Sequence, residues 1–126
     1  MSDVVSEVPA DLWVTATAAV NASSTCTLPA PPAGQNHYIT RIELVKLYAV
    51  VGTASAAGVI VTTTNLPGNP SFTTEQAAGA LGTAPKVISM DFDPPIKSSV
   101  AGTATTFVAP AQAQTIWRWN VIYYNR

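Results

Sequence analysis

The stretch TIWRWNVIYYN, residues Thr115–Asn125, decides the fold of this chain. Side chains of a β-strand point alternately to its two faces, so every second residue shares a face. One face of this run carries Trp117, Trp119, Val121 and Tyr123 without interruption. A face this apolar is stable only when it packs against a second layer, which predicts a buried strand in a layered β-fold. The opposite face carries the mixed set Ile116, Arg118, Asn120, Ile122 and Tyr124.

Shorter runs rich in β-branched residues precede this strand, with turn signals about every 8 to 12 residues. Helical periodicity is absent, and only Thr73–Gly79 is expected to form a helical turn, between a capping Thr and a terminating Gly. The pattern predicts an all-β fold: an antiparallel β-sandwich of jelly-roll type with about eight strands, or alternatively a closed antiparallel barrel. The expected strands are Leu12–Val20, Ser24–Leu28, Tyr38–Val51, Ala57–Asn65, Lys86–Phe92, Lys97–Val100, Thr103–Ala109 and Thr115–Asn125.

Local signals refine where these strands bend and end. The run Tyr38–Val51 would be about 46 Å long at about 3.3 Å per residue, and its apolar phase changes between Leu44 and Val45, which predicts a bulge there. The Pro67-Gly68 pair is typical of the centre of a type II turn. Pro94 and Pro95 follow Lys86–Phe92 and are expected to end that strand.

The composition is poor in charge. Of 126 residues, 6 are Lys or Arg and 7 are Asp or Glu, so 10% are charged, against about 25% in a typical soluble domain. The net charge of −1 and the absence of a basic cluster exclude the electrostatic basis of nucleic-acid binding. No apolar run approaches the roughly 18 residues of a membrane helix, and the first residues do not have the pattern of a secretory signal.

We expect one domain, a β-sandwich over residues 11–126, preceded by a short N-terminal arm over residues 1–10. The arm alternates Val4, Val5 and Val8 with Asp3 and Glu7, so it is expected to order on a neighbouring subunit. Apolar residues on the outer face of the last strand also suit a subunit contact. The expected interface residues are Val4, Val5, Val8, Arg41, Glu43, Arg118, Ile122 and Tyr124.

Residues capable of chemistry are few and scattered along the sequence. Cys26 is the only cysteine and is expected to be a buried thiol in a strand, while His37 is the only histidine. Asp91 and Asp93 form a D-x-D pair that lacks a third metal ligand. We therefore expect no enzyme activity, no catalytic or metal-binding residues and no cofactor.

Three features together resemble a known family: the charge-poor Thr/Ala/Val composition, the phrase VTTTNLPGNPSF at Val61–Phe72, and WRWNVIYYN at Trp117–Asn125. Over residues 36–126 they resemble the small jelly-roll head decoration, or cement, proteins of tailed bacteriophages. The resemblance implies a non-enzymatic virion protein on the capsid exterior, made in the host cytoplasm. It also implies binding to the major capsid protein and to copies of itself, as a dimer or trimer. No functional residue is carried over from the family.

Two other interpretations remain open. A carbohydrate- or receptor-binding module, as in a tail fibre or a lectin, requires Trp13, Trp117 or Trp119 to face solvent beside hydrogen-bonding side chains. A small hydrolase or isomerase on the same fold would depend on His37, although the clustered ligands of such sites are missing from the sequence.

Overall fold

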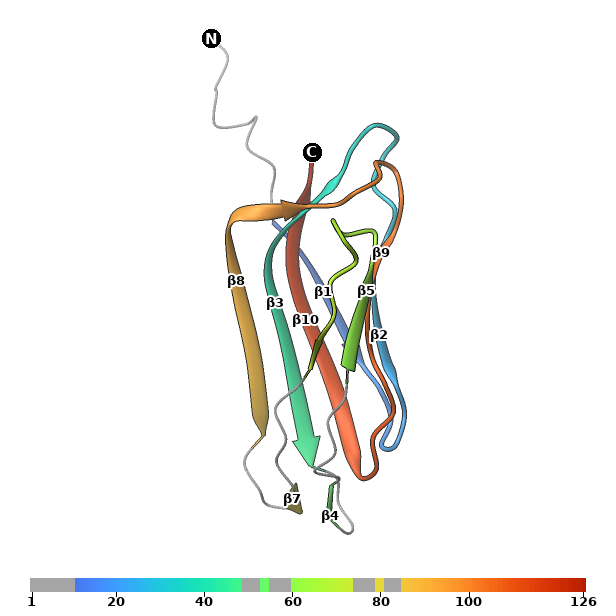
Figure 1. The fold of residues 1–126 in the computed structure, drawn as a ribbon, viewed down its shortest axis with the longest axis vertical. Coiled ribbons are helices and arrows are strands. Elements are labelled where there is room, and N and C mark those ends of the chain that lie inside the picture. Colours follow the sequence, from blue (N-terminus) through green and yellow to red (C-terminus); the bar gives the residue numbers. More distant parts are fainter. Residues whose placement is uncertain (1–10, 49–52, 55–59, 74–78, 81–84) are drawn as a thin grey trace.

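The computed structural model describes residues 11–48, 53–54, 60–73, 79–80 and 85–126 as two four-stranded antiparallel sheets packed face to face (Figure 1). The predicted antiparallel β-sandwich is therefore confirmed. The described residues include no helix that could span a membrane. The first sheet has the order β1 (Leu12–Thr17), β10 (Thr115–Asn125), β3 (His37–Tyr48) and β8 (Lys86–Lys97), and the second has the order β2 (Ser24–Leu28), β9 (Thr105–Ala109), β5 (Ile60–Thr64) and β6 (Phe72–Thr73).

The chain passes from one sheet to the other at almost every connection. β1, β3, β8 and β10 lie in the first sheet, and β2, β5, β6 and β9 lie in the second. A short ribbon of β4 (Thr53–Ala54) and β7 (Gly79–Ala80), which the sequence did not predict, lies at one end of the molecule (Figure 1). Thr73 ends β6 and Gly79 begins β7, so most of the expected helical turn lies outside the described residues, as does the arm with Val4, Val5 and Val8.

β10 is one of the two inner strands of the first sheet, and its Trp-rich face is buried as its sequence predicts. It pairs with all of β1 (Leu12–Thr17), and it pairs with β3 along its whole length. The side chains of Trp117 and Trp119 are fully buried between the sheets. Each indole N–H donates to a backbone carbonyl, Trp117 to Pro110 (3.1 Å) and Trp119 to Ser24 (3.1 Å), so neither ring carries an unsatisfied donor into the core.

The bulge in β3 lies at Thr40 and not between Leu44 and Val45. The pairing of β3 shifts there against both neighbouring strands, and the Thr40 hydroxyl donates to the carbonyl of Ile122. Beyond this point every second side chain points inward, including those of Leu44 and Lys46. Lys46 is buried, and its ammonium lies 6.0 Å from the centre of the Trp117 ring. Burial lowers the pKa of Lys46. The predicted phase change is wrong because a charged residue, Lys46, occupies an inward position, where its aliphatic stem packs in the core.

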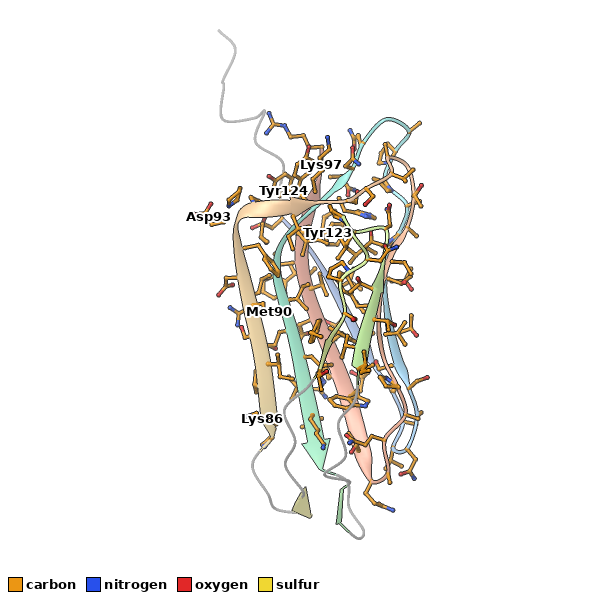
Figure 2. All side chains as sticks on the ribbon, in the orientation of Figure 1. Lys86, Met90, Asp93, Lys97, Tyr123 and Tyr124 are labelled. Carbon is orange, nitrogen blue, oxygen red and sulfur yellow. The ribbon has the colours of Figure 1, made fainter. Side chains whose placement is uncertain are left out.

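β8 continues past Pro94 and Pro95, which corrects the prediction that they end it. The strand turns near Asp93 and crosses the end of the sheet, where Ile96 pairs with Ile39 and Lys97 with Tyr38 (Figures 1 and 2). Four residues of β8 between Asp91 and Ile96 thus stand opposite the single residue Thr40. Prolines are tolerated here because β8 is an edge strand and the corner lacks regular ladder bonds. Residues 98–100 lie in a bend after β8 and not in a separate strand.

The turn after β5 has the predicted type II features. The amide of Asn69 donates to the carbonyl of Leu66 (2.8 Å), and Gly68 has a φ of 75°, a conformation that favours glycine. Asn65, just before it, accepts a bond from the Val100 amide (2.8 Å) and donates to the Thr103 carbonyl (3.1 Å). The phrase VTTTNLPGNPSF therefore has a structural role: it fastens the loop between β8 and β9.

Replacing Trp119 with alanine tests the dependence of the sandwich on β10. We expect Trp119→Ala to lower the free energy of unfolding by about 3–5 kcal/mol, because it leaves a cavity against Phe107, whose ring centre is 5.7 Å away. The neighbouring exposed Arg118→Ala should change it by about 0.5 kcal/mol or less. Urea unfolding followed by circular dichroism measures both, and equal effects would contradict this assignment of faces.

Candidate functional site

The solvent-facing side of the β1-β10-β3-β8 sheet, called here the outer face, gathers most of the polar and charged groups of the sheet. The strand register aligns side chains from all four strands in rows across it. One row consists of Trp13, Ile122, Arg41 and Asp91, the next of Thr15, Asn120, Glu43 and Ser89, and the third of Thr17, Arg118, Val45 and Val87.

Arg41 is the centre of a polar network on this face. Its Nη1 lies 3.0 Å from Oδ1 of Asp91, and its Nη2 lies 3.3 Å from Oε2 of Glu43. The Asn120 amide donates to Oε1 of Glu43 (2.9 Å) and its carbonyl accepts from the Thr15 hydroxyl (2.9 Å). The hydrogen bonds to Asp91 and Glu43 raise the pKa of Arg41. Charges that are scattered in the sequence are thus joined in one network across the sheet.

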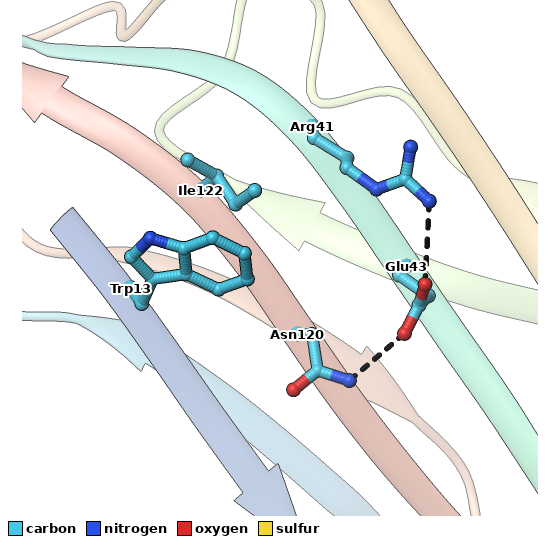
Figure 3. Close-up of a pocket in the computed structure, with 5 residues that line it drawn as sticks. All are labelled: Trp13, Arg41, Glu43, Asn120 and Ile122. Atoms are coloured by element: carbon cyan, nitrogen blue, oxygen red, sulfur yellow. Dashed lines mark hydrogen bonds and ion pairs between the residues drawn. The ribbon is translucent and has the colours of Figure 1, made fainter. Parts of the chain in front are cut away.

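The network borders a hollow of about 480 Å³, called here the Trp13 hollow, which is lined by Trp13, Arg41, Glu43, Asn120 and Ile122 (Figure 3). The Trp13 side chain comes from the edge strand β1 and lies beside Ile122. Trp13 is 67% exposed, whereas Trp117 and Trp119 are fully buried. An exposed indole beside hydrogen-bonding side chains is the feature that a carbohydrate- or receptor-binding module requires.

Farther along the outer face, beyond Asn120 and Glu43, the side chains become aliphatic. Val87 is 51% exposed, and Val45, Leu47 and Ile116 are half-buried beside the exposed Arg118. We call Val45, Leu47, Val87 and Ile116 the aliphatic end. Exposed aliphatic residues that adjoin one another, with an arginine among them, are typical of surfaces that contact another protein.

The structure divides the predicted interface residues among three parts of the outer face. Arg41, Glu43 and Ile122 line the Trp13 hollow, and Arg118 borders the aliphatic end. Tyr124 stacks on Tyr38, with ring centres 5.2 Å apart. Trp13 and Asn120 were not predicted to belong to this site, because alternation within a strand shows which face a residue occupies but not which strands are neighbours.

His37 has a structural position. It is fully buried, with Nδ1 2.8 Å from the Thr105 hydroxyl and Nε2 2.7 Å from the carbonyl oxygen of Pro29. A carbonyl only accepts, so Nε2 carries the proton and Nδ1 accepts from Thr105. Both nitrogens are engaged within the protein, and neither is free to move a substrate proton. Burial lowers the pKa of His37, partly offset by the bond to Pro29.

The remaining candidates also hold structural positions. Cys26 lies in β2 as predicted, and burial raises the pKa of its thiol to about 12, so it is not a reactive thiolate. Asp91 is paired with Arg41. Asp93 lies at the corner of β8 (Figure 2). Within the described ranges no three His, Cys, Asp or Glu side chains come together as a metal site.

A second hollow, of about 290 Å³, lies where β8 faces β5 and β6, and it is lined mainly by apolar residues such as Leu66, Phe72, Met90 and Phe92. These side chains pack against the main core. The outer face of the second sheet is different again, because it presents Thr25, Thr27, Thr62, Thr64 and Thr106, with Thr64 and Thr106 bonded through their hydroxyls (2.6 Å). Among its described residues it offers these hydroxyls and the exposed side chain of Ile60, and no charged group.

The buried His37 predicts a pH-dependent stability. Its folded pKa lies below the ordinary value of 6.5, so as the pH falls below about 6.5 the unfolded chain binds a proton that the folded chain resists. The free energy of unfolding should therefore decrease from pH 7.5 to pH 5.5, above the range in which ordinary carboxylates titrate. Urea unfolding at each pH measures this slope. His37→Gln should be less stable at pH 7.5 and should flatten the slope; an unchanged slope would contradict the assignment.

No protein-family model matches this sequence, and comparison with curated proteins returns no match. The function is therefore argued from the chemistry of the outer face.

Proposed function

We propose that this protein is a non-enzymatic virion structural protein that decorates a phage capsid and stabilises it. In this proposal it binds the major capsid protein and copies of itself, as a dimer or trimer, on the capsid exterior after synthesis in the host cytoplasm. The observation that carries the proposal is the aliphatic end of the outer face, where Val87 is half-exposed beside half-buried Val45, Leu47 and Ile116. A protein partner would remove this surface from water.

The strand order supports the assignment of the sandwich to the jelly-roll class. A jelly roll has eight strands in two sheets, connected as two Greek keys. Here the first sheet has the order β1-β10-β3-β8 and the second the order β2-β9-β5-β6, so consecutive strands mostly lie in different sheets. The outer face of the first sheet is open to solvent along its length and can lie against another protein.

The chemistry of the described residues supports a role without catalysis. His37 and Cys26 are the groups best suited to proton transfer or nucleophilic attack, and both are buried in structural positions. The charged network of Arg41, Glu43 and Asp91 is partly exposed and internally paired. It offers directional contacts to a partner, which suits recognition at an interface.

The outer face has the side-chain composition expected at the centre of a protein–protein interface. Interface hot spots are enriched in Trp, Tyr and Arg, with apolar neighbours that exclude water around them. The outer face carries Arg118 next to Val45 and Val87 in one row, and the stacked pair Tyr38 and Tyr124 at the other end of the strands. Arg118 donates from Nε to the Thr17 hydroxyl (3.3 Å), which leaves its terminal N–H groups for a partner.

A charge placed at the aliphatic end tests the proposal. We expect Val87→Asp to fold normally, because Val87 is exposed, and to weaken both self-association and binding to expanded capsids by at least about tenfold, since an unpaired carboxylate would be buried. Light scattering measures the oligomer. Co-sedimentation with capsids of the phage that encodes the chain measures attachment.

The matched control is Thr25→Asp, which places the same charge on an exposed strand position of the second sheet and should leave both readouts unchanged. A strictly monomeric wild-type protein that does not sediment with expanded capsids would refute the proposed function. Val87→Asp that binds as well as the wild type would remove the aliphatic end from the interface.

A further inference from the structure

The exposure of Trp13 has no explanation in the packing of the sandwich. This residue of the edge strand β1 is 67% exposed, while the chain buries its other two tryptophans completely. An indole has the largest apolar surface of any side chain, and leaving it in water is unfavourable unless a ligand covers it. Its electron-rich face attracts C–H groups that carry a partial positive charge, such as those on one side of a pyranose ring.

The side chains beside Trp13 offer both hydrogen-bond donors and acceptors. Glu43 and Asn120 use one lone pair on each oxygen within the network, and the Asn120 amide uses one of its two hydrogens. Arg41 contacts Asp91 and Glu43 through its two terminal nitrogens, and its five N–H groups exceed these contacts. Each group can therefore form a further hydrogen bond to a sugar hydroxyl, which can both donate and accept a hydrogen bond.

These groups are held in position before any ligand arrives. Arg41 and Glu43 lie on β3 and Asn120 on β10, two paired strands at the centre of the first sheet (Figure 3). The bonds from Glu43 to Arg41 and Asn120, and from Asn120 to Thr15, orient all three side chains. Groups oriented in advance lose little entropy on binding, which favours recognition of a small polar ligand.

The charge of the hollow restricts the ligand. In the lining, Arg41 contributes one positive charge and Glu43 one negative charge. Asp91, which pairs with Arg41 beside the hollow, adds a second negative charge, so the network has a net charge of −1. A uronic acid or a sialic acid would add a further carboxylate beside Glu43 and be repelled. A neutral sugar meets no such repulsion, and its neighbouring hydroxyls can donate to the Glu43 carboxylate while they accept from Arg41 or Asn120.

From these observations we propose that the Trp13 hollow is a binding site for a neutral pyranose unit of a polysaccharide. The sugar ring stacks on Trp13 with Ile122 beside it, and its hydroxyls bond to Arg41, Glu43 and Asn120. The hollow, at about 480 Å³, lies within the range of about 300–1,000 Å³ typical of small-ligand sites. This site goes beyond capsid decoration and does not depend on it.

Tryptophan fluorescence and affinity electrophoresis test the site on the full chain. Probes are three neutral polysaccharides, an α-mannan, a β-glucan and a galactan, together with polygalacturonate as the anionic probe. At least one neutral polysaccharide should retard the protein in the gel and shift its emission to shorter wavelength, because Trp13 is the exposed indole. Polygalacturonate should do neither.

Variants assign the binding to the hollow. Trp13→Ala and Asn120→Ala should each weaken retardation by at least about tenfold, and Trp13→Ala should also abolish the emission shift. Thr17→Ala, on β1 but outside the hollow, is the matched control and should bind as the wild type does. Glu43→Gln removes one negative charge and should make retardation by polygalacturonate detectable.

The possible failures are distinguishable. Retardation by no neutral polysaccharide would overturn the site, and stronger binding of polygalacturonate than of any neutral probe would overturn its selectivity. Neutral binding that survives in both Trp13→Ala and Asn120→Ala would place the sugar elsewhere. Val87→Asp should keep neutral polysaccharide binding while it loses capsid attachment, so the failure of one proposal does not imply the failure of the other.

Discussion

The burial of the aromatic face of β10 is the constraint on which the rest of the structure depends. Trp117 and Trp119 fill the space between the sheets, and the indole of Trp119 also bonds to the Ser24 carbonyl on the second sheet. Because strand side chains alternate, this burial necessarily turns Arg118, Asn120 and Ile122 outward. The two strands that pair with β10 then bring their own outward residues into register with them. The core of the protein thereby determines the composition of the outer face.

The low charge of the chain has a structural explanation in the difference between its two sheets. The second sheet is solvated by threonine hydroxyls, and threonine also favours extended backbone, so it supports the strands while it keeps the surface polar. The first sheet holds Arg41, Glu43, Asp91 and Arg118 on its outer face. The few charges on these strands are thus concentrated on the face where Trp13 and Val87 are also exposed. A surface that combines directional polar groups with exposed apolar groups is suited to recognition, whereas the second sheet presents mainly hydroxyls, with Ile60 as its exposed aliphatic residue.

Alternation in the sequence predicted most of the strands and the correct faces of β10, because each strand of a sandwich has one buried side. It failed where a neighbour changes the outcome: Lys46 turns inward because the Trp117 ring and the core accept its stem, and β8 continues past Pro94 because it is an edge strand. The candidate site was less predictable for the same reason. Thr15 and Asn120 are 105 residues apart and bond across β1 and β10. Only the order of strands in the sheet brings Trp13 beside Asn120, and the local sequence pattern does not predict that order.

The same strand order places the two proposed contacts side by side on the outer face. Trp13 lies on β1 and Val87 on β8, the opposite edges of the first sheet, about 14 Å apart at about 4.8 Å between strands. Trp13 lies in the same row as Asp91, and Asp91 is four residues from Val87 on β8, which is about 13 Å along the strand. The diagonal between them is therefore about 20 Å. An interface of roughly 600 Å² per partner has a radius of about 14 Å, so a contact of that size centred on Val87 leaves Trp13 in solvent. The same contact covers Glu43 and Asn120, which lie about 8 Å and about 12 Å from Val87 by these spacings. A protein partner of this size at the aliphatic end and a sugar at the Trp13 hollow would therefore compete for these two side chains.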